Sequence, residues 1–279
     1  MTGKKIVIIG CGYVGQAIAK RWQAVGHELT VTTTSPEKVS QLADLAQRVK
    51  VIEGSNQDSL RELCEGQDVI LLSVGSKGGR TEENYRRSYL QTAQTLRDAL
   101  RTNSTVKQLI YTSSYSVVGN HNGAWVDEET LDRPMNVFSE ILKETEETLM
   151  NIQTGDRQVC ILRLGGIYGE GREILKIFRR AMGTTKAGKG EEYGNWIHRE
   201  DIVRGIKFAE EERLSGLFNL VSDEPMQRRE MLDRLAKKYN LDPVIWDDSK
   251  PSDRVFNVRV SNKKLRDQGF LLAYPTIQL

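Results

Sequence analysis

The sequence is poor in cysteine, and its few cysteines are scattered along the chain. Cys11, Cys64 and Cys160 show no CxxC spacing and are odd in number, so neither a disulfide framework nor a zinc site is expected. The three histidines show no metal-ligand spacing either. We therefore expect a protein without a metal site, with reduced thiols, in the cytoplasm.

The chain also lacks an excess of charge and a long apolar run. Its 279 residues carry 40 Lys and Arg against 38 Asp and Glu, a formal net charge of +2, which does not favour binding to a nucleic-acid backbone. No apolar run approaches membrane-spanning length, and the first five residues lead directly into a predicted core strand. These absences predict a protein that binds neither nucleic acid nor membrane and has no signal peptide.

A glycine-rich turn, GCGYVG, follows the first apolar run and precedes a helical pattern. In a dinucleotide site this order has a physical reason: Gly10 makes a tight turn, Gly12 lets the backbone approach a pyrophosphate, and Gly15 lets the helix pack closely on the strand. Tyr13 and Val14 then belong to a helix N-terminus that attracts phosphate. A purely structural glycine turn is the alternative.

The residues after the second predicted strand bear on the choice of dinucleotide. An NAD site usually ends this strand with an acid, whereas NADP requires hydroxyls or cations for its 2′-phosphate. This chain has Thr34, Ser35 and Lys38 there, with no acid before Glu37. The cofactor is therefore expected to be NAD(P), with a slight lean to NADP. On the alternative interpretation Ser35 merely caps the next helix and Lys38 is solvated.

Strand and helix patterns alternate along the first 220 residues, which predicts a doubly wound parallel sheet, the Rossmann architecture of the α/β class. We expect a dinucleotide-binding domain over residues 1–165, completed by about 196–222, and a smaller C-terminal α+β substrate lobe from 166–195 and 223–279. Strands are predicted at 6–9, 29–32, 49–52, 68–75, 108–114, 159–164 and 217–221. Helices are predicted at 82–101, 139–150, 174–182, 201–212 and 229–239.

Six motifs occur in the order seen in one known family. They are GCGYVG at 10–15, YTSSYSVVG at 111–119, DEETLDRP at 127–134, LRLGGIYGEG at 162–171, WIHREDIVRGI at 196–206 and SNKKLRDQGF at 261–270. Through them nearly the whole chain resembles the extended short-chain dehydrogenase/reductase family, in particular its NAD-dependent epimerase/dehydratase branch and the atypical members near it.

The resemblance implies catalytic positions at Ser114, Ser139 and Lys143. In the family a Ser or Thr after the fifth strand polarises the substrate oxygen, a Tyr acts as acid/base, and a Lys four residues later holds the nicotinamide ribose. Ser114 and Lys143 match, but the Tyr position is Ser139. An aliphatic hydroxyl is a far weaker acid than a phenol. Ser139 is therefore interpreted as a helix N-cap with Glu140 in the first turn, as a substrate or ribose contact, or as the acid/base.

The resemblance also implies further cofactor contacts. Ser55, with Asn56 beside it, stands where the family often has an Asp for the adenine, and Thr34 stands where it usually has an acid or an Arg. Val74 and Gly75, at the end of the fourth predicted strand, border the expected site.

Three other side chains are candidates for the proton that Ser139 cannot supply: Tyr115, Tyr168 and His198. Each also has a structural interpretation: Tyr115 as a packed ring, Tyr168 as part of the structural Tyr-Gly pair of the family, and His198 as a side chain whose hydrogen bonds are made within the protein.

The leading functional hypothesis is an NAD(P)-dependent epimerase, dehydratase or reductase acting on a nucleotide sugar or related hydroxyl/carbonyl compound. The alternative is a catalytically silent NAD(P)-binding sensor or scaffold, and a third hypothesis is an interaction protein without a cofactor. The family implies a homodimer, paired through the helices at 85–100 and 139–150.

Overall fold

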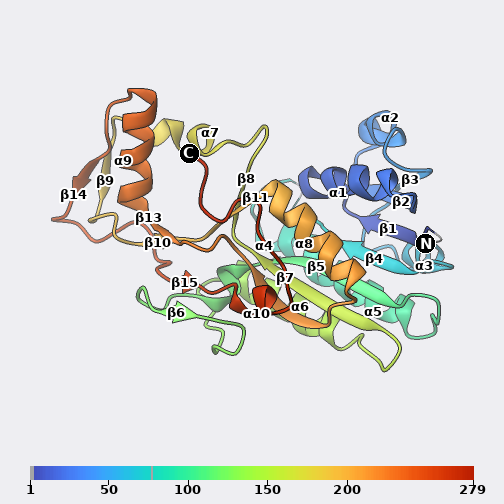
Figure 1. Ribbon diagram of the computed structural model, residues 1–279. Helices are drawn as coiled ribbons and strands as arrows, with labels where there is room; N and C mark the ends of the chain where they lie inside the picture. Colours follow the sequence, from blue (N-terminus) through green and yellow to red (C-terminus); the bar gives the residue numbers. More distant parts are fainter. Residues whose placement is uncertain (1–2, 77) are drawn as a thin grey trace. The chain divides into compact units, whose positions relative to one another are not determined.

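Seven strands form the central sheet of the computed structural model, which describes residues 3–76 and 78–279 (Figure 1). Their order across the sheet is β12-β7-β5-β4-β1-β2-β3, and the sheet is parallel. This confirms the doubly wound α/β class. The strands are β1 (Lys5–Ile9), β2 (Glu28–Thr33), β3 (Arg48–Val51), β4 (Val69–Leu72), β5 (Gln108–Ser114), β7 (Gln158–Leu164) and β12 (Gly216–Leu220).

Helices cover both faces of this sheet because its central strands are apolar on both sides. Val7 and Ile9 of β1 point into a core shared with α3, α5 and α6, while Ile8 points to the opposite face, where α1 lies. The helices are α1 (Tyr13–Ala24), α2 (Val39–Ala43), α3 (Gln57–Cys64), α4 (Glu82–Tyr85), α5 (Thr92–Leu100), α6 (Val137–Met150) and α8 (Arg199–Glu211), with a 3₁₀ turn at Pro36–Lys38.

The long helix predicted over 82–101 is interrupted in its register. Between α4 and α5 the segment Arg86–Gln91 forms a π-helix, a wider turn that occurs often at functional sites. A pattern of apolar residues at helical spacing does not distinguish an α turn from a single π turn.

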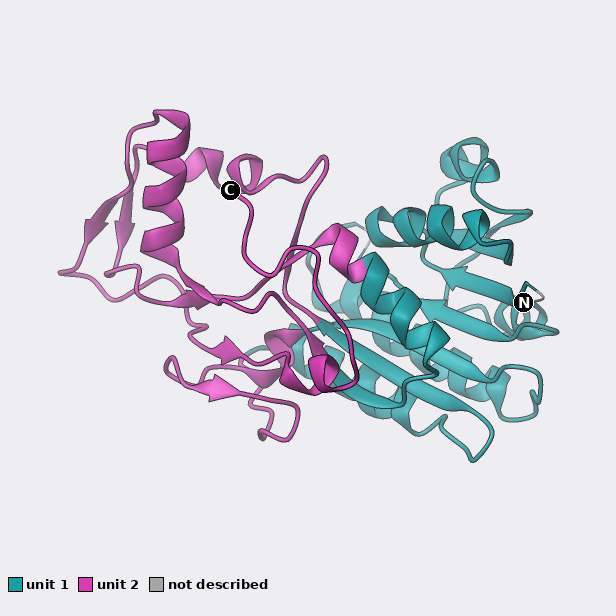
Figure 2. Ribbon diagram, in the orientation of Figure 1, with its two compact units in different colours: residues 1–114, 136–163, 203–218 teal, residues 115–135, 164–202, 219–279 magenta. Residues whose placement is uncertain are grey.

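The chain divides into two compact units (Figure 2). Unit 1 comprises residues 1–114, 136–163 and 203–218, and unit 2 comprises 115–135, 164–202 and 219–279. Segment 115–135, which the sequence assigns to the first domain, groups with unit 2, and the domain boundary at residue 165 stays a prediction.

Unit 2 is built from short elements around two apolar clusters. One cluster contains Leu232 and Leu235 of α9, and the other contains Val126 of β6 and Val260 of β15. Two-residue and three-residue strands pair as β8–β11, β9–β14, β10–β13 and β6–β15. The elements are β6 (Trp125–Val126), β8 (Gly166–Tyr168), α7 (Ile174–Phe178), β9 (Thr185–Ala187), β10 (Tyr193–Gly194), β11 (Trp196–His198), β13 (Met226–Gln227), α9 (Arg228–Tyr239), β14 (Ile245–Asp247), β15 (Arg259–Val260) and α10 (Lys263–Asp267), with 3₁₀ turns at Tyr115–Val118 and Arg179–Ala181.

Candidate dinucleotide site

A pocket of 330 Å³ opens in unit 1 at the carboxyl ends of β1, β2 and β4. This edge of an open parallel sheet is where such folds place their ligands. Seven predicted cofactor residues line it: Gly10, Gly12, Thr34, Ser35, Lys38, Val74 and Gly75. The other lining residues are Ile9, Cys11, Thr32, Thr33, Ile52, Gly54, Ser73 and Ser76.

The three glycines of the turn occupy three different environments. Gly10 has φ +90°, and a Cβ on it would come within 2.6 Å of the Ser73 carbonyl oxygen. A Cβ on Gly15 would come within 2.7 Å of the Gly10 carbonyl oxygen, so this position permits close packing of α1 on β1. A Cβ on Gly12 would meet nothing within 4 Å. Space is therefore left in front of the turn for a ligand.

Helix α1 begins directly behind this space. Tyr13, Val14 and Gly15 form its first turn, and its N-cap, Gly12, has no side chain to cover the first N–H groups. A helix N-terminus without a side-chain cap keeps its partial positive charge available to an anion. The residues present thus fit the pyrophosphate of a dinucleotide.

The turn is fixed to the end of β2 by backbone donors. The Gly10 N–H donates to Thr32 Oγ1 over 3.0 Å, and the Cys11 N–H donates to the Thr32 carbonyl over 2.9 Å. Burial raises the pKa of the Cys11 thiol to about 12. Cys11 therefore lines the pocket as a neutral thiol and not as a nucleophile.

Ser35 does not cap the following turn, contrary to the alternative considered from the sequence. It occupies the N-cap position before Pro36, but its side chain makes no capping hydrogen bond, and its N–H donates to Thr33 Oγ1 over 3.1 Å. The Ser35 side chain is instead a buried wall of the pocket, beside Thr34 and Lys38.

Ser55 and Asn56 lie after β3 and do not line the pocket. Asn56 caps α3, because its Oδ1 accepts the Ser59 N–H over 3.0 Å. Ser55 is exposed, and Gly54 is the residue of this loop that borders the pocket.

Ser139 is not the N-cap of its helix. That position belongs to Asn136, whose Oδ1 accepts the Phe138 and Ser139 N–H groups over 3.1 Å each. Ser139, at the third helical position, completes a capping box: its hydroxyl accepts the Asn136 N–H over 3.3 Å and donates to the Asn136 carbonyl over 2.9 Å. Ser139 is 1% exposed, so its hydroxyl is committed to the start of α6.

The other two predicted catalytic residues lie in unit 1. Ser114 is the last residue of β5, and Lys143 lies in the second turn of α6. The Lys143 side chain is 35% exposed, and its Nζ is 3.9 Å from Glu147 Oε1. Such an exposed pair is weak and leaves the ammonium able to move toward a ligand.

The three alternative proton donors belong to unit 2 and are already in contacts. The Tyr115 hydroxyl is 3.5 Å from Arg254 Nη2, and the Tyr168 hydroxyl accepts the Gln278 N–H over 3.0 Å. The His198 ring stacks on Tyr274 with centroids 3.8 Å apart.

The sequence did not reveal a buried charged group beneath the end of β5. Glu146 of α6 accepts the Ser113 hydroxyl over 2.5 Å, and the Arg163 guanidinium of β7 binds its two oxygens over 2.6 to 3.1 Å. The available signal was Arg163 inside an apolar strand, since a buried arginine requires a carboxylate partner.

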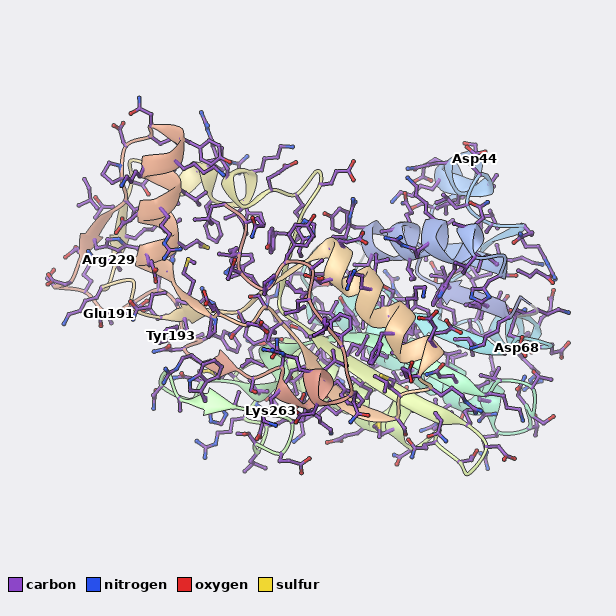
Figure 3. All side chains as sticks on the ribbon, in the orientation of Figure 1. Asp44, Asp68, Glu191, Tyr193, Arg229 and Lys263 are labelled. Carbon is purple, nitrogen blue, oxygen red and sulfur yellow. The ribbon has the colours of Figure 1, made fainter. Side chains whose placement is uncertain are left out.

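A larger hollow of 490 Å³ lies in unit 2, lined by Trp125, Asp223, residues 260–263, Arg266, Asp267 and Leu271. Lys263, labelled in Figure 3, is one of its lining residues. This hollow contains none of the predicted site residues, so volume alone does not mark the cofactor site.

Within residues 3–76 and 78–279 no group of three acidic, Cys or His side chains is able to hold a metal, and no helix there is long and apolar enough to cross a membrane.

Comparison with known proteins agrees with this fold. Protein YeeZ from Escherichia coli (strain K12) is 27% identical over 98% of this chain and 97% of its own. The solved structure of a functionally unknown conserved protein from Silicibacter pomeroyi DSS superposes with a TM-score of 0.77 at 22% identity, covering 98% of this chain and 95% of that one. The structure of UDP-glucuronic acid 4-epimerase from Bacillus cereus in complex with NAD superposes with a TM-score of 0.76 at 18% identity, covering 98% of this chain and 94% of that one. The model of the NAD dependent epimerase/dehydratase family matches residues 6–220, and the chain belongs to this family.

Proposed function

We propose that unit 1 binds a nicotinamide dinucleotide with its pyrophosphate over Gly12 and its adenosine half between β1 and β2. The observation that carries this proposal is the open space at Gly12 in front of α1, between two glycines that are closely packed. A bound dinucleotide supplies hydride transfer, which no amino-acid side chain provides.

The site residues have separate parts in this proposal. Ser114, at the end of β5, orients the reacting oxygen of the substrate, and Lys143 binds the nicotinamide ribose. Ser139 contributes no proton, because its hydroxyl is buried in the capping box. The proposed reaction is an epimerisation, dehydration or reduction at a hydroxyl/carbonyl centre.

A nucleotide sugar is the proposed substrate class. The name of the Bacillus cereus relative supports the same class. The homodimer stays a prediction.

The test is a fluorescence titration of the protein with NADH and with NADPH, followed by turnover assays with a panel of nucleotide sugars. Binding of either dinucleotide, weakened at least about tenfold by Gly12→Ala, supports the site. Lack of binding to both dinucleotides would exclude the site.

The preference for NADP stays a prediction, and Lys38→Ala tests it. In this variant the affinity for NADPH should fall about tenfold while the affinity for NADH stays unchanged.

A catalytically silent NAD(P)-binding protein is the second candidate, and one observation favours it. The Ser139 hydroxyl is hydrogen-bonded in the capping box, so position 139 supplies no acid. Under this alternative the dinucleotide binds with ordinary affinity, and no member of the substrate panel changes the oxidation state of the nicotinamide.

A further inference from the structure

Tyrosine rings gather beside the first turn of α6 in unit 1. The Tyr85 ring lies 4.7 Å from the Phe138 ring and 4.9 Å from the Tyr89 ring. Phe138 directly precedes Ser139, and the Arg80 guanidinium lies 4.6 Å from the Phe138 ring centroid. A phenol on α4 therefore contacts the helical turn at which the expected catalytic phenol is missing.

The same rings connect this turn to the dinucleotide pocket. The Tyr89 hydroxyl is hydrogen-bonded to the backbone of Ser76, and Ser76 lines the pocket. Helix α4 packs along α6, and the next residue, Arg86, has its Nη1 3.8 Å from Glu144 Oε2. The contacts of Tyr85 and Tyr89 thus join the loop at Ser76 to the first turn of α6.

The phenols of this cluster differ in their burial and in their hydrogen bonds. Tyr111 is fully buried, which raises its pKa well above the ordinary value, and burial raises the pKa of Tyr89 to about 12. Tyr85 and Tyr89 are both half-buried, but among the described residues the Tyr85 hydroxyl has no hydrogen-bond partner, whereas the Tyr89 hydroxyl is bonded to Ser76. Tyr85 is therefore the phenol of the three that remains available to a ligand.

We propose that Tyr85 is the acid/base of this protein, donating its phenolic proton from α4 in place of the residue at position 139. The inference rests on the dinucleotide site proposed above. Tyr85 would give its phenolic proton to the substrate carbonyl oxygen as that carbonyl is reduced, and water would return a proton to the phenolate; a dinucleotide bound in the pocket would supply the hydride. In the oxidative direction the phenolate removes the proton of the substrate hydroxyl.

The first test measures the phenol without relying on turnover. Absorbance at tyrosinate wavelengths is titrated with pH in the absence and presence of saturating NAD⁺, for the wild type, Tyr85→Phe and the matched control Tyr89→Phe. A positive nicotinamide ring beside a phenol favours the phenolate, so one ionisation should move to lower pH by about half a pH unit or more. The inference requires that this change is lost in Tyr85→Phe and kept in Tyr89→Phe.

The second test uses 9,10-phenanthrenequinone as the carbonyl probe with NADPH or NADH. Tyr85→Phe should lower kcat about 100-fold or more, the range of general acid catalysis, with the dinucleotide Kd unchanged. Tyr89→Phe should stay within about threefold of the wild type. Full quinone turnover by Tyr85→Phe, or a NAD⁺-dependent ionisation that persists in it, would overturn the inference.

The inference and the proposed function fail separately. A wild type that binds neither dinucleotide contradicts the dinucleotide site, and the inference falls with it. A wild type that binds but shows no ionisation dependent on Tyr85 contradicts Tyr85 alone. If the quinone is not reduced by the wild type, the tyrosinate titration decides.

Discussion

Gly10 and Gly12 show how two identical residues two positions apart carry different constraints. Gly10 adopts φ +90° against the carbonyl of Ser73, whereas Gly12, with φ −91°, faces open space. Gly10→Ala should therefore destabilise the fold by about 1–3 kcal/mol. Gly12→Ala should leave the Tm nearly unchanged and weaken only the binding of the dinucleotide. Thermal denaturation with and without NADH separates the two; an equal loss of Tm in both variants would contradict this assignment.

Ser139 is better understood as a stabilising residue than as a failed catalyst. Since its hydroxyl completes the capping box with Asn136, Ser139→Ala should cost about 0.5–2 kcal/mol of unfolding free energy. Dinucleotide affinity should not change. Urea denaturation checks the first expectation and fluorescence titration the second; Asn136→Ala is the matched control at the same cap.

The buried environment of position 139 also changes an experiment that the sequence alone would suggest. Restoring the family phenol by Ser139→Tyr would place a large ring at a site that is 1% exposed. Overpacking of this kind costs about 1–3 kcal/mol. We expect loss of stability without gain of reductase activity; a newly active, stable Ser139→Tyr would contradict the structure at this turn.

His198 should make unit 2 sensitive to acid. Burial lowers its pKa below the ordinary value, and the neighbouring carboxylates Asp201 and Glu200 oppose this only in part. The unfolded chain then binds the proton more readily, so stability falls as the pH drops through about 6.5. His198→Phe keeps a ring against Tyr274 and should show a flatter loss of Tm between about pH 7.5 and 5.5. Parallel curves for both proteins would exclude this role.

At the scale of elements, the sequence predicted most strands to within a residue or two. The apolar run at residues 108–114 coincides with β5, and 159–164 begins one residue inside β7. Continuous apolar runs ended by polar residues define buried parallel strands locally. The start of α6 was placed two residues late, because Asn136 and Ser139 are both good capping residues and only the backbone decides between them.

The parts of the site that were not predictable depend on contacts between elements. The Ser113–Glu146–Arg163 group joins residues from β5, α6 and β7, and the contact between Tyr85 and Phe138 joins two helices. No spacing along the chain encodes these pairs, since each residue has an ordinary local role in its own element. By contrast, the glycine turn was predictable because its three positions are local.

The Glu146–Arg163 pair should be a strong stabilising contact only when both partners are present. Glu146→Ala leaves the guanidinium of Arg163 buried at 2% side-chain exposure without its carboxylate, which should cost about 3–5 kcal/mol. The double variant Glu146→Leu, Arg163→Met should recover much of this loss. Urea denaturation of both variants tests the coupling, and a double variant no more stable than Glu146→Ala would contradict it.

At the scale of the whole molecule, the family assignment agrees with a composition that offers neither a charge excess nor a disulfide framework. The formal net charge is +2, and the three cysteines are buried and form no disulfide. The proposed chemistry relies on a dinucleotide bound at the glycine turn. Saturation with that molecule at 100 times its Kd should stabilise the fold by about 2.7 kcal/mol.

The interleaving of the two units has a consequence for synthesis. Unit 1 takes its last segment from residues 203–218, after most of the preceding 40 residues have gone into unit 2. During translation one edge of β7 stays unpaired until β12 has been synthesised and has left the ribosome. Exposed edges of this kind attract other nascent strands. The interval between synthesis of residue 164 and synthesis of residue 220 is thus the one in which this edge of β7 has no partner strand.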